Sequence, residues 1–382
     1  MFSTRLTGPG ASHHARHSLL EAHRVSSTSK STCLRYIHSK GHRHYTSYQD
    51  DKNSIEAGFA SKAVGLVVLG VAVGGGFLYL QNPRRERTSV LDKQIFQDFT
   101  IVAKERLCPT SAIFTLRPAG LKSAGRCDVY EKAWASGLWS VEFRQPELQI
   151  ARSYTPLPPS PHESGGTSDL RFLIRREFKG EVSNYLDRLP LGSTIGVRGP
   201  KIEYEIPRDV SDVIFLAGGT SIAPALQMVH SLLYHSKSLE SLPRVRVLWA
   251  NRRREDCVGG KPPQRYSLWS RSKESTPAPS PSALVQEMNQ LEHESRGRVT
   301  FEYFVDEEGT CIDPGRISRA VRSGSGSPPS TEGGRLLVIS GPDGFIKHLA
   351  GPKQLRGDAE VGGPLGGCLS RLCLDGWTLV KL

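Results

Sequence analysis

The stretch that decides the fold is residues 213–229, which read VIFLAGGTSIAPALQMV. Its first part, Val213–Ala217, is a short continuous apolar run, the pattern of a strand that is buried on both faces of a sheet. Gly218, Gly219 and Thr220 follow as a turn, and Pro224–Val229 begins a helical segment. Strand, glycine turn and helix form the unit from which parallel sheets are built, so this stretch predicts a parallel sheet covered on both faces.

Two later stretches repeat this pattern, and a third supplies another strand. Val245–Ala250 is followed by a polar loop, Arg335–Ser340 is followed by a Gly-Pro pair, and Val299–Val305 is a strand-forming run between them. We therefore predict a Rossmann-like domain with a parallel sheet over residues 211–382. Insertions rich in Pro, Ser and Gly, near residues 259–282 and 323–334, show no periodicity and are predicted to have little fixed structure.

Residues 91–207 have a different pattern. Short β-rich runs, including Ser111–Leu116, Trp139–Phe143 and Leu170–Arg175, are separated by Gly and Pro. Runs of this length and spacing are typical of antiparallel barrels and sandwiches. We therefore predict an antiparallel β-barrel for this part. It would be a separate domain, since a chain of 382 residues is long enough for two.

The first 49 residues have the composition of a targeting segment. They contain seven Lys or Arg and seven of the twelve His but a single acid, Glu21, and they have no sustained apolar run. A basic, Ser-rich segment with few acids predicts a mitochondrial presequence, and Arg43–Thr46 resembles a matrix-peptidase cleavage site. The alternative is a disordered basic tail.

Ala63–Leu80 runs for eighteen residues without a charge, close to the length that a helix needs to cross a bilayer core. The alternative to a membrane span is a buried helix of a soluble domain. The five glycines of this run would destabilise such a helix, whereas glycines are tolerated in membrane helices. We therefore predict one transmembrane helix at 63–80. Arg84, Arg85 and Arg87 would keep the carboxyl side in the matrix by the positive-inside rule. Import led by a presequence would instead place the folded part in the intermembrane space, anchored in the inner membrane, and we favour this orientation.

The seven cysteines indicate no metal centre. They lie at positions 33, 108, 127, 257, 311, 368 and 373, without a C-x-x-C or C-x-x-C-H spacing. Zinc, iron–sulfur and covalent haem sites therefore lack their usual ligand pattern. Cys368 and Cys373 are near enough in sequence to pair, but we expect isolated thiols.

Arg152, Tyr154 and Thr155 have the residue types that a flavin dinucleotide needs from a β-domain. A cation for its phosphates, an aromatic face for its ring and a small hydrogen-bonding group near the reactive N5 edge follow one another along one predicted strand. Taken alone, this motif also fits an ordinary exposed strand end.

A second motif contains Gly180, Val182 and Ser183 and opens a predicted helix. The free N–H groups of its first turn and the Ser183 hydroxyl can hold a pyrophosphate, although a Ser N-cap without a ligand has the same appearance. The two motifs precede the glycine turn and Ser340-Gly341-Pro342 in an order that resembles the ferredoxin-reductase and cytochrome b5 reductase superfamily over residues 91–382. In that superfamily R-x-Y-[ST] and G-x-[VM]-S motifs bind FAD, and a G-G-T-G-I-[AT]-P turn receives the pyrophosphate of the pyridine nucleotide.

The resemblance implies a role for each motif. Tyr154 and Thr155 would be the catalytic residues, since Tyr154 would stack on the flavin ring and Thr155 would hydrogen-bond near N5. Arg152 and the Gly180 motif would hold the FAD phosphates. The residues that would bind NADPH or NADH are Gly218, Gly219, Thr220, Gly341 and Pro342.

Within the superfamily the sequence is similar to the fungal mitochondrial cytochrome c import-factor flavoproteins, which share a presequence, one span and a Gly-rich carboxyl end. This similarity implies an NAD(P)H-dependent FAD oxidoreductase that passes electrons to a one-electron iron acceptor, haem during cytochrome c maturation. Its partners would be the inner mitochondrial membrane and the cytochrome c haem-attachment machinery or haem, with no nucleic acid polymer. Residues 84–382 carry 41 basic and 34 acidic side chains, a balance that disfavours a basic partner such as cytochrome c itself.

Two residues depart from the superfamily pattern. Ser221 replaces the fourth glycine of the turn, so that a Cβ and a hydroxyl lie where a pyrophosphate must approach the backbone. Ser340 replaces the cysteine that commonly precedes Gly-Pro. Two alternatives therefore stay open: a non-catalytic or weakly catalytic FAD-stabilised assembly factor for cytochrome c haem attachment, and an NADH-cytochrome b5 reductase. Arg252–Arg254 lie where a 2′-phosphate is read, which slightly favours NADPH over NADH.

Overall fold

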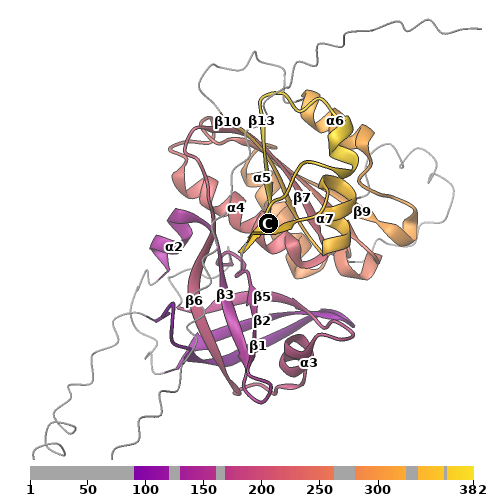
Figure 1. Cartoon of the computed structure of the whole chain (residues 1–382). Helices are drawn as coiled ribbons and strands as arrows, with labels where there is room; N and C mark the ends of the chain where they lie inside the picture. Colours follow the sequence, from indigo (N-terminus) through magenta and orange to yellow (C-terminus); the bar gives the residue numbers. More distant parts are fainter. Residues whose placement is uncertain (1–89, 120–129, 161–167, 262–279, 324–333, 357–358) are drawn as a thin grey trace, which may run out of the picture. The chain divides into compact units, whose positions relative to one another are not determined.

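The computed structural model describes residues 90–119, 130–160, 168–261, 280–323, 334–356 and 359–382 (Figure 1). No helix within these ranges is long and apolar enough to span a bilayer. The predicted presequence, the predicted span at 63–80 and most of both insertions lie outside the described residues.

Six antiparallel strands form the first sheet, in the order β4-β3-β6-β1-β2-β5. They are β1 (Gln97–Cys108), β2 (Ser111–Pro118), β3 (Gly137–Gln145), β4 (Ile150–Tyr154), β5 (Leu170–Arg175) and β6 (Thr194–Glu205). Just beyond β4, Leu157 forms an isolated antiparallel bridge with Arg171 of β5. The two edges of the sheet therefore meet, and the sheet curls into a partly closed barrel. The antiparallel sheet predicted from the sequence is confirmed.

The interior of this sheet is aromatic. Phe99, Trp139, Phe143 and Phe172 are completely buried, and two short helices cover the same core. These are α2 (Glu131–Ser136) and α3 (Glu181–Arg188). Helix α3 buries its apolar side in this core and leaves its first turn near the end of β4.

Five parallel strands form the second sheet, in the order β13-β10-β7-β8-β9. They are β7 (Val210–Gly218), β8 (Arg244–Asn251), β9 (Val299–Val305), β10 (Gly334–Ser340) and β13 (Trp377–Lys381). The chain starts in the middle at β7, proceeds outward to β9 and then returns to the other side of β7 with β10. This reversal places the carboxyl ends of β7 and β10 side by side, the position where sheets of this type bind ligands.

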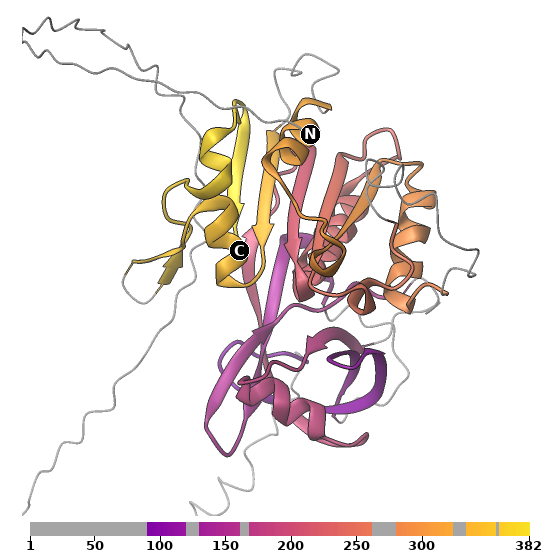
Figure 2. The same ribbon diagram turned by 90° about the vertical axis from the view of Figure 1, so that its right-hand side faces the viewer.

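Helices cover both faces of the parallel sheet (Figure 2). Helices α4 (Ile222–His235) and α5 (Ala283–Glu294) pack on one face, and α6 (Pro314–Ser323) and α7 (Asp343–Ala350) pack on the other. Along β7 the side chains alternate between the two cores. A strand buried in this way must be apolar at every position, as the 213–217 run is. The short strands β11 (Gln354–Arg356) and β12 (Ala359–Val361) pair with each other near the carboxyl end.

Gln227 of α4 fastens the parallel-sheet layer to the barrel. Its side chain is fully buried, its Oε1 accepts from the backbone N–H of Trp139 at 2.7 Å, and its Nε2 donates to the Trp139 carbonyl at 3.2 Å. The same Nε2 also approaches the Pro156 carbonyl at 3.4 Å. A buried amide with this set of partners satisfies backbone groups that β3 cannot pair within its own sheet.

An ion pair crosses the same boundary. Arg171 of β5 donates to Glu287 of α5, with Nη2 at 2.6 Å from Oε1, and both side chains are largely buried. Apolar residues from the barrel, including Leu138 and Leu157, join the core that α4 and α5 cover. The two sheets therefore share one continuous core on this side.

Replacing Gln227 with Leu tests this boundary. The substitution leaves the Trp139 N–H and carbonyl buried without their partners, so we expect the free energy of unfolding to fall by about 2 to 4 kcal/mol. Urea unfolding of the detergent-solubilised chain, followed by tryptophan fluorescence, measures this change. Gln286→Leu on the exposed surface of α5 removes one hydrogen bond, to the Pro281 carbonyl at 2.7 Å. It is the control and should lower stability by less than about 1 kcal/mol. Equal stabilities of the two variants would contradict the assignment.

Lys381, at the end of β13, lies in a cage of carbonyl groups. Its Nζ donates to the carbonyls of Gly351 at 3.2 Å, Pro352 at 3.4 Å and Pro364 at 3.0 Å, and the residue is buried. Burial lowers the pKa of Lys381 to about 8. The cage ties the Gly-rich carboxyl segment to the end of α7, because Gly351 follows that helix directly.

This lowered pKa gives stability a defined pH dependence. Between about pH 8 and 10.5 the unfolded chain keeps the Lys381 proton and the folded chain releases it. The unfolded state then binds more protons, so this residue makes stability rise with pH in that window. Lys381→Met should abolish this rise, and chemical denaturation at pH 7.5, 8.5 and 9.5 measures it. Parallel pH profiles for the two proteins would refute the assignment.

Candidate functional site

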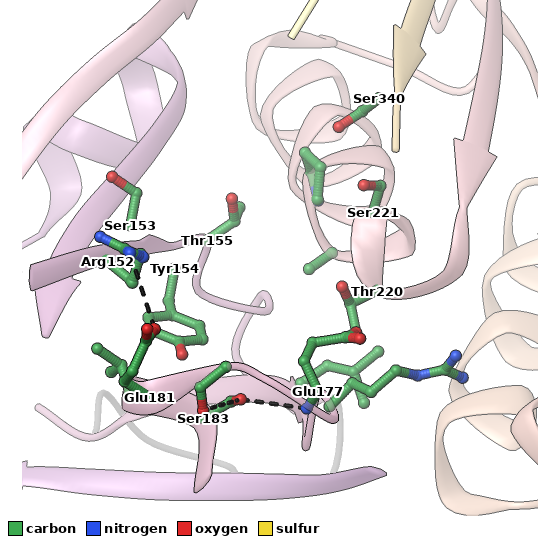
Figure 3. Close-up of a pocket in the computed structure, with 16 residues that line it drawn as sticks. Arg152, Ser153, Tyr154, Thr155, Glu177, Glu181, Ser183, Thr220, Ser221 and Ser340 are labelled. Atoms are coloured by element: carbon green, nitrogen blue, oxygen red, sulfur yellow. Dashed lines mark hydrogen bonds and ion pairs between the residues drawn. The ribbon is translucent and has the colours of Figure 1, made fainter. Parts of the chain in front are cut away.

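A cleft of about 360 Å³ lies between the end of β4, the start of α3 and the carboxyl ends of β7 and β10 (Figure 3). The barrel contributes Arg152, Ser153, Tyr154, Thr155, Leu173 and Arg175, together with the 177–183 segment. The parallel-sheet layer contributes Thr220, Ser221, Ala223, Pro224 and Ser340. Both FAD motifs predicted from the sequence and part of the glycine turn therefore line one cleft.

Tyr154 ends β4 and forms part of the cleft wall. Its ring stacks on Phe143 of the neighbouring strand, with centroids 4.8 Å apart and planes inclined by 26°. Burial raises the pKa of Tyr154 to about 12, opposed in part by Arg152. The phenol therefore stays protonated at physiological pH and can donate a hydrogen bond, while Phe143 fixes the plane of its ring.

Arg152 lies two residues before Tyr154, and its guanidinium faces the start of α3 (Figure 3). Its Nη2 lies 3.9 Å from Oε2 of Glu181, and both side chains are more than half exposed, at 59% and 52%. A pair this exposed and this long contributes little to stability, so an anion with better geometry can displace Glu181. The sequence motif did not reveal this internal competitor.

Ser183 has a local role that sequence reasoning missed. Its hydroxyl donates to the Gly180 carbonyl at 3.1 Å and accepts from the Glu177 N–H at 3.1 Å. A Cβ on Gly180 would lie 2.4 Å from the Ser183 Oγ, so glycine is required for this contact. The hydroxyl therefore holds the 177–183 loop in shape, and the backbone N–H groups of the first α3 turn remain as the anion donors.

The glycine turn after β7 is held from the neighbouring strand. Gly219 has a φ of +59°, a conformation that favours glycine, and its carbonyl accepts from the indole Nε1 of Trp249 at 2.7 Å. Among the residues that the structure describes, a Cβ on Gly219 would meet nothing within 4 Å, so the space beside this residue is open. Thr220 and Ser221 follow in the same short 3₁₀ segment and line the cleft.

Gly218, Gly219, Gly341 and Pro342 are outside the cleft lining, although they adjoin it in the chain. Phe345 of α7 explains part of this arrangement. A Cβ on Gly218 would lie 3.1 Å from its ring, and a Cβ on Gly341 would lie 2.5 Å from it. The ring of Phe345 packs against the backbone of both glycines and leaves no room for a side chain there. Packing alone therefore requires glycine at these two positions, independent of any ligand.

Two of the three arginines after β8 pair with carboxylates. Arg253 pairs with Glu255 at 3.2 Å, and Arg254 pairs with Glu308. Next to them Asp256 pairs with Arg175 of the cleft wall and also accepts from the Cys108 Sγ at 3.3 Å. Cys108, Cys257, Cys311, Cys368 and Cys373 are all free thiols, as predicted for the cysteines within the described residues.

The chemistry of the cleft suits a dinucleotide with an aromatic ring. An aromatic wall, a displaceable cation, a neutral hydroxyl at Thr155 and a helix start with free N–H groups lie within one cleft. The donor set therefore fits FAD, with the carboxylates of Glu177 and Glu181 as its unfavourable members.

Comparisons with known proteins agree with this chemistry. The family model described as "Oxidoreductase FAD-binding domain" matches residues 134–206. The cytochrome c mitochondrial import factor CYC2 of Saccharomyces cerevisiae is 32% identical over 147 residues, which cover 36% of this chain and 39% of that protein. NADH-cytochrome b5 reductase 1 of Cryptococcus neoformans is 26% identical over 323 residues, which cover 82% of this chain and 93% of that protein.

Among solved structures, the cytochrome b5 reductase domain of Ulva prolifera nitrate reductase is similar, with 19% identity and a TM-score of 0.47. The match covers 68% of this chain and 92% of that domain. The family model and the sequence relatives support FAD as the cofactor and NAD(P)H as the electron donor. Together with the cleft chemistry, they show that this chain is similar to the ferredoxin-reductase-type flavoproteins.

Proposed function

We propose that this protein is a membrane-anchored mitochondrial flavoprotein oxidoreductase. It passes electrons from NAD(P)H through FAD to a one-electron iron acceptor, haem during cytochrome c maturation. The predicted presequence and the predicted span at 63–80 support the location, with the folded part in the intermembrane space. The similarity to the cytochrome c mitochondrial import factor supports the process, and this chain spans 39% of the length of that relative.

One observation carries the proposal: the cleft joins the end of β4 to the carboxyl ends of β7 and β10. Tyr154 and Thr155 lie on one wall, while Thr220, Ser221 and Ser340 lie on the other. An electron donor held by the parallel sheet would therefore meet a ring held by the barrel. Such proximity is what a two-cofactor electron transfer requires of its protein.

The residues of the cleft have distinct roles in this proposal. Arg152 and the first-turn N–H groups of α3 hold the FAD phosphates, after Glu181 has moved away. Tyr154 covers the ring and, being protonated, acts as a hydrogen-bond donor and not as a base. Thr155 supplies a hydrogen bond near the ring edge. Bound FAD supplies the conversion of a two-electron donor into single electrons, which no side chain here can perform.

The donor site uses the other wall. Gly218, Gly219 and Thr220 hold the phosphates of the nucleotide at the start of α4, and Gly341 and Pro342 border its nicotinamide. The open space beside Gly219 supports this assignment, because a phosphate can approach the backbone there.

Specific observations also favour a second candidate, a weakly catalytic FAD-stabilised assembly factor for haem attachment. Ser221 and Ser340 both line the cleft, so the two departures from the superfamily pattern lie where the donor must enter. The packing of Phe345 on Gly218 and Gly341 would preserve these glycines even without turnover. A third candidate is an NADH-cytochrome b5 reductase, supported by the relative of which this chain covers 93%.

Anaerobic reduction of the bound flavin tests the enzyme. We expect NADH or NADPH to bleach the flavin absorbance of the full chain in detergent. Ser221→Gly should accelerate bleaching at subsaturating nucleotide by about threefold or more, because it removes a Cβ from the path of the pyrophosphate. Ser236→Gly, the same change at the other end of α4, is the control and should leave the rate unaltered.

The outcomes separate the candidates. A yellow protein that neither nucleotide reduces, with or without Ser221→Gly, would rule out the enzyme and leave the assembly factor. Flavin reduction followed by rapid electron transfer to cytochrome b5 but not to ferric haem would instead support the b5 reductase.

Substitution of Tyr154 tests the cofactor site itself. Tyr154→Ala removes the aromatic wall and should weaken FAD binding about tenfold or more, whereas Tyr154→Phe keeps the ring and should retain FAD. The ratio of flavin to protein absorbance, and FAD released on boiling, measure occupancy. Tyr185→Ala on α3 controls for the loss of a partly buried ring elsewhere in this core. Full occupancy of Tyr154→Ala would refute the stacking role.

A further inference from the structure

The loop after β8 is where a pyridine nucleotide would be identified, if the proposed donor site is correct. β8 is the neighbour of β7, and Gly218 lies beside Ala250. In sheets of this type the residues just past the second strand contact the 2′ position of the adenosine ribose. A hydroxyl at that position means NADH, and a phosphate means NADPH. The groups around Arg252–Arg254 therefore decide which donor fits.

All three guanidinium nitrogens of Arg254 donate hydrogen bonds within the protein. Its Nε donates to Oε1 of Glu308 at 2.6 Å, its Nη2 bonds the other oxygen of Glu308, and its Nη1 donates to the Gly260 carbonyl at 2.9 Å. A bidentate pair of this kind is among the strongest contacts that arginine makes. The hydrogen bond from Arg254 accordingly lowers the pKa of Glu308, which keeps the carboxylate charged.

The acidic turn that supplies Glu308 is fixed to the arginine loop. Glu307 Oε1 accepts from the backbone N–H of Arg254 at 2.6 Å, and the Glu307 N–H donates to the Arg252 carbonyl at 3.2 Å. The turn is closed by Thr310, whose Oγ1 accepts from the Val305 N–H at 2.6 Å. These contacts hold the turn after β9 against the loop after β8.

Charge at this edge of the sheet does not favour a phosphate. Besides the three arginines, the loop after β8 and the turn after β9 carry five carboxylates, those of Glu255, Asp256, Asp306, Glu307 and Glu308. Asp256 pairs with Arg175 of the barrel. Arg253 pairs with Glu255, and Arg252 and Arg253 are both exposed. A dianionic 2′-phosphate that used Arg254 would have to break the Arg254–Glu308 pair and approach the carboxylate of Glu307, which contacts the Arg254 backbone.

We propose that Glu308 sets the donor selectivity of this protein, by holding Arg254 away from the ribose 2′ position, so that NADH is bound in preference to NADPH. This inference rests on the proposed function for its donor site. It reverses the slight preference for NADPH that the three arginines suggest in sequence. Glu308 acts through Arg254 and is a positioning residue. Its effect must therefore appear in the measured affinity for each nucleotide and not in turnover alone.

The test compares NAD⁺ and NADP⁺ binding to the full chain in detergent by titration calorimetry. Wild-type protein should bind NAD⁺ at least about tenfold more tightly than NADP⁺. Glu308→Gln keeps the shape of the side chain but frees the Arg254 charge, so NADP⁺ affinity should rise about fivefold or more while NAD⁺ affinity changes less than about twofold. Adding Arg254→Gln to this variant should cancel the gain. Glu240→Gln makes the same charge change on the loop before the amino end of β8 and should alter neither affinity.

Each result has a distinct meaning. If the wild type bound NADP⁺ as tightly as NAD⁺ or more tightly, or if Glu308→Gln did not raise NADP⁺ affinity, the role of Glu308 would be overturned. The proposed reductase would remain intact. Binding of neither nucleotide to any variant would overturn this role together with the donor half of the proposed function. A gain that survives Arg254→Gln would show that Glu308 repels the phosphate directly and would overturn its action through Arg254.

Discussion

The buried contact of Gln227 with Trp139 is the interaction on which the cleft depends. The two walls of the cleft belong to different sheets, and residues 206–209 alone connect β6 to β7 along the chain. Their relative position must therefore come from noncovalent contacts. A fully buried amide that pairs with both backbone groups of one residue tolerates little displacement, because any shift leaves buried polar groups unpaired. The Arg171–Glu287 pair and the shared apolar core act in the same direction.

The arginines of the cleft and of the loop after β8 do not give this region a simple positive charge. The chain has a formal net charge of +12, yet Arg152, Arg175 and Arg254 each face a carboxylate. The strength of these pairs differs: the exposed Arg152–Glu181 contact is weak, whereas Arg254 is bound through all its nitrogens. An anion can therefore recruit Arg152 at low cost but not Arg254. Arg152 is therefore available to bind a cofactor, whereas Arg254 has a structural role.

The glycines of the motifs serve packing as well as binding. Gly180 makes room for the Ser183 hydroxyl, and Gly218 and Gly341 make room for the Phe345 ring. A mutation at any of these positions would disturb the fold before it disturbed a ligand. Their presence in the sequence is therefore weaker support for nucleotide turnover than for the fold itself. The open space at Gly219 is different, because no atom in the described part of the chain packs there.

Much of the fold could be read from local sequence. Alternating β-rich runs predicted the antiparallel sheet, and the apolar run 213–217 before a glycine turn predicted the parallel one, since burial on one face or on both leaves a distinct period in the chain. The resemblance to the reductase superfamily implied that Arg152 and the Gly180 motif act together, and in the structure both motifs line one cleft. Local patterns do not, however, specify which side chain meets which across a boundary.

The sequence by itself determined the two sheet types, the order of the motifs and the residue types available for a dinucleotide. The tertiary structure decided which of those residues are free. Glu181 reaches Arg152 from another element, Glu308 reaches Arg254 across 54 positions, and Phe345 reaches Gly218 from the far side of the sheet. The reason is physical: hydrophobic periodicity is a property of neighbours along the chain, whereas the pairing of charges and the packing of rings depend on distances that exist only after the strands have assembled.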